Sequence, residues 1–393
     1  MELTRVVRGS EPAPPDQITT TPRGPWVVTT LTIDLDRARG HLEATYGPHL
    51  APVERTTDLV RSAGALAGVN ASFFAHSASP EHPGDPVGLG LYDGALLSEP
   101  TTDRAEADLV VDSRSDRVLI GRTAWSGAVR NRQSDDTLPL DHLDHPPVVP
   151  PACAELPDQT QCDHPGDVVL FHPEFGPTPS GHGTEVVLDQ RGCVVRTSAT
   201  RRTTLEPHQT SLQATGRDAA ALLSTTENGC LDRISTLTDD DGDRILVRPG
   251  VFGVNGRYRL VADGEVVVPP GSGDFFARNP RTIAGTTAEG RIVLATVDGR
   301  RPTSVGTTLD ETAALAAALG PDGRGQPRRR SAPRPHRSAA ASPTSPAARK
   351  NEPSATHSST SRMRSPLPPR AETHPTSSAG PPRTSPCSCA ART

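Results

Sequence analysis

One stretch near the end of the folded part, residues 279–320, constrains the fold of this chain most, because the signals for a strand, a turn and a capped helix follow one another there. Residues 292–297, with the sequence IVLATV, have the length and β-branched content of a buried strand. The turn Asp298-Gly299-Arg300 follows at once. It would present one carboxylate and one guanidinium at the end of that strand.

A helix is predicted next, over 308–319. Thr308 and Glu311 have the spacing of a capping box, and Gly320 is a natural C-terminal stop. Upstream of the strand, Asn279-Pro280-Arg281 forms a rigid turn that carries a second arginine. The whole stretch therefore places two arginines and one aspartate around the ends of a central strand.

Three strings in this stretch, NPRTIAG, TVDGR and SVGTTLDETAALAAALG, resemble the phosphodiester glycosidase family in their order and spacing. Asn279 stands where the family usually has histidine, and Thr307 where methionine is usual. The resemblance covers about residues 25–320. It implies a hydrolase that cleaves a sugar-1-phosphodiester of the N-acetylglucosamine-phosphodiester type, in cell-surface or exopolysaccharide glycans.

Two further segments extend the resemblance. Residues 68–74, GVNASFF, are similar to the family's NGGFF-type motif, with Ala71 and Ser72 in place of two glycines. Asn70 there could both donate and accept hydrogen bonds to a ligand, or alternatively cap a turn at a buried strand end. In residues 168–189, Thr178 and Glu185 match a family threonine and a glutamate that opens a strand. Glu185 is either an acid/base group or a glutamate on the solvent face of its strand.

The chemistry implied by the family needs cations, a carboxylate and polar orienting groups. Arg281 and Arg300 are predicted to bind the phosphate, unless they pair structurally with Asp298 or with a carbonyl. The predicted catalytic carboxylates are Asp298 and Glu185. Further substrate-binding residues are predicted at Asn70, Thr178, Asn279 and Ser304. A non-catalytic glycan- or phosphate-binding domain and an inactive fragment remain as alternatives.

Charge is divided unevenly along the chain. Residues 321–393 carry 13 Lys and Arg against 3 Asp and Glu, a net charge of +10, whereas the whole chain has −5. The remaining body is therefore strongly acidic, which argues against nucleic acid as its partner. No run approaches the length of a membrane span. We predict a glycan or sugar-phosphodiester substrate and no cofactor, and the sequence makes no prediction about the oligomeric state.

The cysteines and histidines bear on location and metals. Four cysteines without CxxC spacing favour two disulfides, Cys153–Cys162 and Cys193–Cys230, although unpaired thiols of a cytosolic protein remain an alternative. Four histidines have no helical i, i+4 spacing beside a carboxylate, so we expect exposed loop residues and no metal: His142, His145, His164 and His172. Residues 1–24 show no signal peptide, but the family is usually secreted, so the chain is predicted to start downstream of an export signal.

The C-terminal segment, residues 321–393, is predicted to be disordered because it contains 14 prolines and almost no large apolar residues. The family continues after the helix with a glycine-rich string and further core strands. The codons of residues 322–330, shifted by one nucleotide, permit such a string, so we hypothesise a frameshift near Gly320. The alternative is a genuine basic tail.

These signals together predict an α+β fold in one domain, residues 25–320, between the lead-in 1–24 and the tail. It would have a largely antiparallel central sheet with flanking helices near residues 57–65, 210–224 and 308–319.

Overall fold

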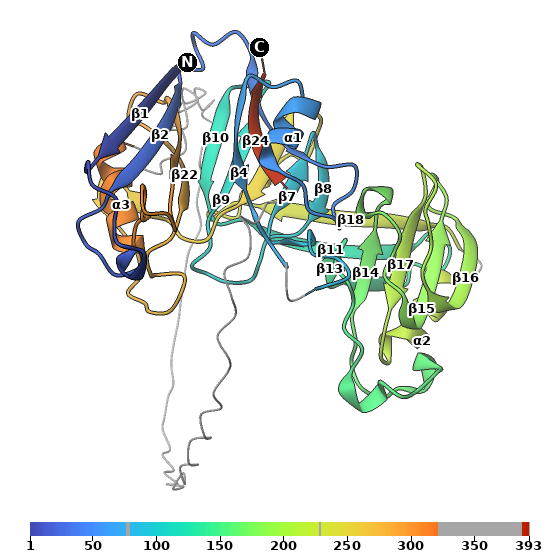
Figure 1. The fold of residues 1–393 in the computed structure, drawn as a ribbon. Coiled ribbons are helices and arrows are strands. Elements are labelled where there is room, and N and C mark those ends of the chain that lie inside the picture. Colours follow the sequence, from blue (N-terminus) through green and yellow to red (C-terminus); the bar gives the residue numbers. More distant parts are fainter. Residues whose placement is uncertain (76–78, 228, 321–386, 393) are drawn as a thin grey trace, which may run out of the picture. The chain divides into compact units, whose positions relative to one another are not determined.

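The computed structural model describes residues 1–75, 79–227, 229–320 and, for the backbone, 387–392. In this part of the chain strands dominate, and they form seven separate sheets beside three α-helices (Figure 1). The predicted α+β class with one helix-flanked central sheet is therefore wrong. Apolar periodicity indicates which residues form a strand but not which strands pair, and the short runs here are divided among many sheets. The frameshift hypothesis concerns residues outside the described ranges.

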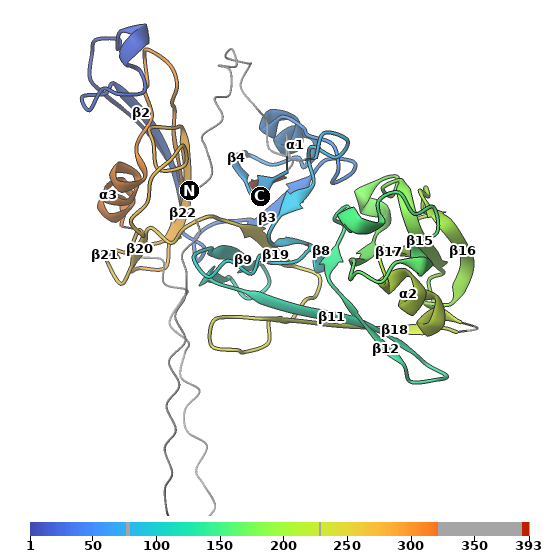
Figure 2. The same ribbon diagram turned by 90° about the horizontal axis from the view of Figure 1, so that it is seen from below.

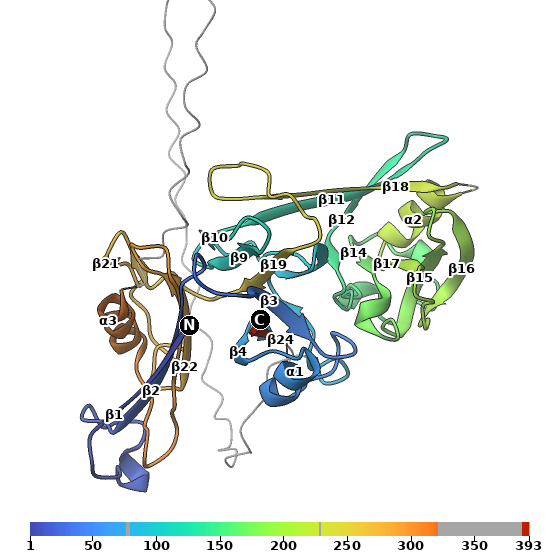
Figure 3. The same ribbon diagram turned by 90° about the horizontal axis from the view of Figure 1, so that it is seen from above.

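The first sheet is built around the strand that the sequence marks most strongly. It has the order β1 (Glu2–Arg8), β2 (Trp26–Ile33), β23 (Ile292–Val297) and β22 (Arg281–Thr286), all antiparallel. Helix α3 (Leu309–Leu319) lies beside it (Figure 3), where Ala316 packs on Ile283 and Ala295. The predicted capping box of Thr308 and Glu311 is confirmed.

The second sheet contains two antiparallel hairpins. Its order is β10 (Arg117–Gly121), β9 (Asp108–Asp112), β19 (Val251–Asn255), β7 (Gly90–Tyr92) and β8 (Ala95–Ser98). Asp93 and Gly94 join β7 to β8, and both have positive φ, at 49° and 80°, as a tight two-residue turn requires. The adjoining three-stranded ribbon has the order β12 (Thr137–Leu140), β11 (Ala124–Asn131) and β18 (Leu231–Thr238).

A five-stranded sheet carries most of the middle of the chain (Figure 2). Its order is β13 (His142–Leu143), β14 (Val168–Phe171), β17 (Thr210–Ala214), β15 (Gly181–Leu188) and β16 (Val194–Arg201). Helix α2 (Asp218–Thr226) packs against it through the buried Leu222. The helix predicted near 210–224 is thus wrong in its first part, where Thr210–Ala214 form strand β17 and residues 211–214 are all buried.

The remaining strands form one three-stranded sheet and two pairs of short strands. Strand β24 (Cys387–Arg392) lies between β3 (His41–Tyr46) and β4 (Ala67–Ala71), antiparallel to both. The predicted first helix is confirmed as α1 (Thr56–Ser62). Two pairs of two-residue strands are β5 (Phe73–Phe74) with β6 (Pro86–Val87), and β20 (Val261–Ala262) with β21 (Glu265–Val266).

Candidate functional site

The two arginine-bearing turns predicted from the sequence meet at one end of β22 and β23. Arg281 opens β22 opposite Val297, the last residue of β23. Asn279 and Thr307 exchange both backbone hydrogen bonds, at 3.0 and 2.9 Å. A Cβ at position 299 would overlap the backbone of Pro280, so only glycine lets the two turns approach each other this closely. The turns 279–281 and 298–300 therefore form one structural unit.

The two guanidinium groups of this unit have N–H donors to spare. Arg281 donates to three carbonyls, those of Phe275, Ala277 and Thr307, at 2.6, 2.7 and 3.3 Å. Arg300 donates from Nε and Nη2 to the side-chain oxygen of Asn279, at 3.2 and 2.7 Å. Since an arginine has five N–H donors, both Nη1 donors of Arg281 and three donors of Arg300 are left for a ligand.

Neither guanidinium is neutralised by an acid in the described part of the chain. Burial and the nearby positive charge of Arg300 lower the pKa of Arg281. Of the two structural alternatives, the carbonyl contacts of Arg281 are present, whereas no ion pair joins either arginine to Asp298. Two neighbouring cations that share no counterion favour an anionic ligand.

An aromatic cluster lies beside these cations. The guanidinium of Arg281 is 5.1 Å from the ring centroid of Phe275. That ring is 5.9 Å from Phe73 and 5.3 Å from Tyr258, and Phe73 remains 42% exposed. Aromatic residues make up only 3% of the chain, yet three of them gather here. Their rings supply an exposed apolar face next to a positive charge.

Two copies of the tripeptide Gly-Val-Asn converge on the same region. The first ends at Asn70, whose side-chain oxygen accepts a 2.7 Å hydrogen bond from Thr282. The second ends at Asn255, which accepts a 2.7 Å bond from the backbone N–H of Phe73. The Nδ2 group of Asn255 and the hydroxyl of Ser72 are buried without a hydrogen-bond partner among the described atoms. Buried polar groups are normally hydrogen-bonded, so these two atoms mark the region as one where a ligand or water could complete the contacts.

Ser72 also explains why the family favours glycine in this motif. Its φ is +66°, a left-handed conformation that glycine adopts at no steric cost. The serine is kept in this strained conformation between β4 and β5. The motif at 68–74 therefore shapes the backbone that faces the aromatic cluster.

The turn of Asp298 is held by Ser304. The Ser304 hydroxyl accepts from the backbone N–H of Val27 at 2.9 Å and donates to the carbonyl of Asp298 at 2.7 Å. Ser304 is only 1% exposed, so its contacts are with the protein rather than with a substrate. The carboxylate of Asp298 is on an exposed residue and is free to face solvent or a ligand.

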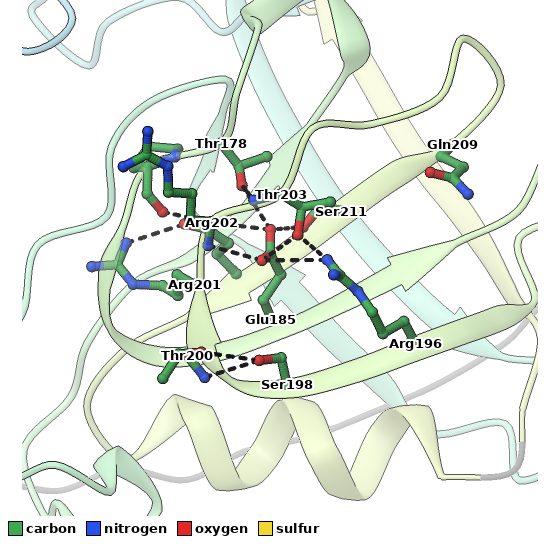
Figure 4. A network of polar contacts seen from close by, with 12 residues as sticks. Thr178, Glu185, Arg196, Ser198, Thr200, Arg201, Arg202, Thr203, Gln209 and Ser211 are labelled. Carbon is green, nitrogen blue, oxygen red and sulfur yellow. Dashed lines mark hydrogen bonds and ion pairs between the residues drawn. The ribbon is translucent and has the colours of Figure 1, made fainter.

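Thr178 and Glu185 come together elsewhere, in the five-stranded sheet (Figure 4). Glu185 is 1% exposed. Its Oε1 accepts from Thr178, Ser211 and Gln213, at 2.8, 2.8 and 3.1 Å. Its Oε2 accepts from the N–H of Arg202 and the hydroxyl of Thr203, at 3.0 and 2.7 Å.

Burial acts to raise the pKa of Glu185, but the hydrogen bonds from Thr203, Gln213, Thr178 and Ser211 outweigh it and leave the pKa lowered. The carboxylate has no oxygen open to a substrate, and no contact in the described chain links it to Asp298. We therefore give Glu185 and Thr178 no catalytic part in the function proposed below.

Three of the histidines expected to be exposed loop residues are paired with carboxylates, and for these the prediction is wrong. The Nδ1 atoms lie 2.6–2.7 Å from acidic oxygens in the pairs His142–Glu99, His145–Asp85 and His172–Asp144. No sequence pattern indicates these pairs, because each acid lies at least 28 residues away from its histidine. No cluster of three or more metal-ligating side chains occurs among residues whose structure is described.

Both predicted disulfides are confirmed. Cys153 is bonded to Cys162, nine residues away, and Cys193 to Cys230, 37 residues away. The alternative of unpaired thiols at these four positions is therefore wrong, and disulfides are typical of oxidising compartments. Within the described ranges, no helix combines the length and apolar character needed to cross a bilayer.

Comparisons with known proteins define the class. Residues 182–322 match the model of the family described as phosphodiester glycosidase. The resemblance seen in the sequence is thereby confirmed over these residues. The match includes both arginine turns and the buried Glu185, whereas the 68–74 motif lies outside it. The search of curated proteins gave no match.

Solved structures support the fold over a longer range. A candidate exported protein of Burkholderia pseudomallei K96243 is 28% identical with a TM-score of 0.63, over 78% of this chain and 69% of that one. A hypothetical protein from Synechocystis is 17% identical with a TM-score of 0.58, over 77% of this chain and 54% of that one. The auto-inhibited catalytic domain of zebrafish N-acetylglucosamine-1-phosphodiester alpha-N-acetylglucosaminidase has a TM-score of 0.31 at 10% identity, over 81% of this chain and 67% of that one, which is too low for structural conclusions.

Sequence reasoning missed two parts of this site. The first is Asn255, which the repeated Gly-Val-Asn string could have indicated, since its first copy was already singled out. The second is the aromatic cluster of Phe73, Tyr258 and Phe275, whose members are far apart in sequence and meet only through the fold.

Proposed function

We propose that this protein hydrolyses a sugar-1-phosphodiester at the site formed by the two arginine turns and the 68–74 motif. The observation that carries the proposal is the pair Arg281 and Arg300, two adjacent cations that have no acidic partner among the described residues. A phosphodiester carries the single negative charge that such a pair can bind through its remaining N–H donors.

The substrate's sugar would lie against the aromatic cluster. Phe73 and Phe275 offer an apolar face, and Asn70 and Asn255 offer amides that orient hydroxyl groups. The exposed Asp298 would stabilise positive charge at the anomeric carbon or activate a water. Because a phosphodiester is a weakly basic leaving group, neutralisation by the arginines contributes more than proton donation. The two disulfides support an extracellular place for this reaction, on cell-surface or exopolysaccharide glycans.

The test is a turnover assay with a chromogenic N-acetylglucosamine-1-phosphodiester. Arg281→Gln and Arg300→Gln are each expected to lower kcat/KM by about 10–100-fold, the value of a lost charge-assisted hydrogen bond. Arg301→Gln is the matched control, since Arg301 is the next residue, is exposed and makes backbone hydrogen bonds only. Binding without turnover in the unchanged protein would point to a glycan- or phosphate-binding domain instead. Equal loss in all three variants would remove the assigned role of the arginine pair.

A further inference from the structure

A second cavity lies apart from the arginine turns, over one face of the β11–β18 ribbon. Its volume is about 400 Å³, within the range of small-molecule sites. The ribbon pairs Trp125 with Leu237, Gly127 with Ser235 and Val129 with Arg233, so these side chains share one face. The hairpin 94–97 and the loop 244–247 provide the other walls.

Trp125 forms a flat platform in this cavity. A Cβ at Gly127 would overlap the six-membered ring of the indole, so the ring lies over the bare backbone of the same strand. The indole N–H donates to the hydroxyl of Ser235 at 2.9 Å, which fixes the ring in its plane. One face of the ring is thus covered by the strand, and the half-buried residue lines the cavity.

Arg233 is held beside this platform by an uncommon chain of contacts. Its Nη1 lies 2.7 Å from Nε2 of His172, and Nδ1 of His172 lies 2.6 Å from the buried carboxylate of Asp144. An arginine can only donate, so Nε2 must accept and the single ring proton must be on Nδ1. His172 therefore orients the guanidinium by accepting its hydrogen bond, with Asp144 on the other side of the imidazole ring.

Among the residues that line the cavity, arginines outnumber acids. Arg233 uses one of its five N–H donors and has no ion pair in the described chain, which leaves four donors. Arg244, also without a described acidic partner, adds a second cation to the lining, against one acid, Glu174. The exposed Leu246 and Val247 continue the wall as apolar surface, at 64% and 39% exposure.

We propose that this cavity binds a carboxylated sugar, such as a hexuronate unit of an acidic polysaccharide. The planar fork of Arg233 matches a carboxylate, and the indole of Trp125 matches the apolar face of a pyranose ring. A neutral sugar could stack on the indole of Trp125, but it would leave the guanidinium of Arg233 without an anionic partner. The cavity would thus hold an acidic glycan on a set of residues that includes none of the two arginine turns.

The experiment is isothermal titration calorimetry on the full chain at low salt, with tetragalacturonate and its neutral methyl ester as probes. The acid is expected to bind at least tenfold more tightly than the ester. Arg233→Gln should weaken the acid's binding at least tenfold and Trp125→Ala should weaken that of both probes. Arg130→Gln is the matched control, because Arg130 is on the same ribbon, next to the Val129 that faces Arg233, but pairs with Asp232 on the opposite face.

Equal affinity for acid and ester, equal loss in Arg233→Gln and Arg130→Gln, or no binding by the unchanged protein would each overturn the proposal. Should Arg233→Gln fail to fold, Arg244→Gln decides, with an expected loss of at least threefold. Turnover of a small phosphodiester is expected to be unchanged in Arg233→Gln, so this site and the proposed hydrolysis are tested independently.

Discussion

Asn70 accepts a 2.7 Å hydrogen bond from Thr282, which lies 212 residues later in the chain. The bond joins β4 to β22 and thereby links the 68–74 motif to the strand that carries Arg281. Both ends of the folded chain thus contribute to one site, and the amide of Asn70 is positioned by the neighbouring sheet rather than by its own strand.

Replacing Thr282 with valine should remove this link. We expect a loss of about 1 kcal/mol in stability, since one hydrogen bond is lost, and a larger effect on turnover because the Asn70 amide is released. The measurement is kcat/KM beside urea unfolding. Thr296→Val is the control, because Thr296 is paired with Thr282 across the sheet and makes no side-chain hydrogen bond in the described chain. The proposed role of the bond is wrong if the two variants lose activity equally.

Glu185 should make the protein sensitive to acid. Its folded pKa lies below the unfolded reference of 4.5, because its hydrogen bonds outweigh the effect of burial. The stability it contributes is therefore complete above pH 4.5 and is lost as the pH falls through the lower folded pKa. Glu185→Leu, which leaves the buried donors unpaired, should cost about 3 kcal/mol at neutral pH. It should also flatten the unfolding free energy measured by urea titration between pH 5 and 3, and an unchanged slope would contradict the assignment.

Asp108 should have the opposite effect on how stability depends on pH. Burial raises its pKa to about 7, although hydrogen bonds from Thr123 oppose the shift. The folded state then holds a proton that the unfolded state releases near pH 4. Stability should accordingly fall as the pH rises from about 4 to about 7, by at most about 1.4 kcal/mol per pH unit for this one proton. Asp108→Asn should remove that dependence, as measured by urea unfolding at a series of pH values. Parallel curves for the two proteins would show that Asp108 is charged throughout.

Local signals in the sequence predicted local structure well. The strand at 292–297, the capping box at Thr308 and both disulfides are all present, because each depends on residues close together or on simple spacing. The division into seven sheets could not be predicted, since pairing between distant strands follows from the packing of whole faces.

The candidate site also contains residues that local sequence predicts and residues that it does not. Arg281, Arg300 and Asn279 meet as their spacing around one strand indicates. Ser304 and Glu185 have the residue types that substrate contacts require, yet both are buried with their hydrogen bonds satisfied by the protein. Burial and satisfaction depend on segments far away in sequence, as does the pairing of His172 with Asp144, and no single-sequence pattern reports them.

Strand β24 lies between β3 and β4 and pairs with the backbone of both. Without it, both strands would have an open edge facing the gap, and unpaired edges exchange their amide hydrogens and associate readily. In a chain ending at Pro386, the amides of 41–46 and 67–71 should lose most of their protection in hydrogen exchange, while those of β23 should keep theirs. A synthetic peptide with the sequence of 387–392, added in excess, should restore protection. Unchanged exchange in β3 and β4 after the truncation would show that another segment fills this position.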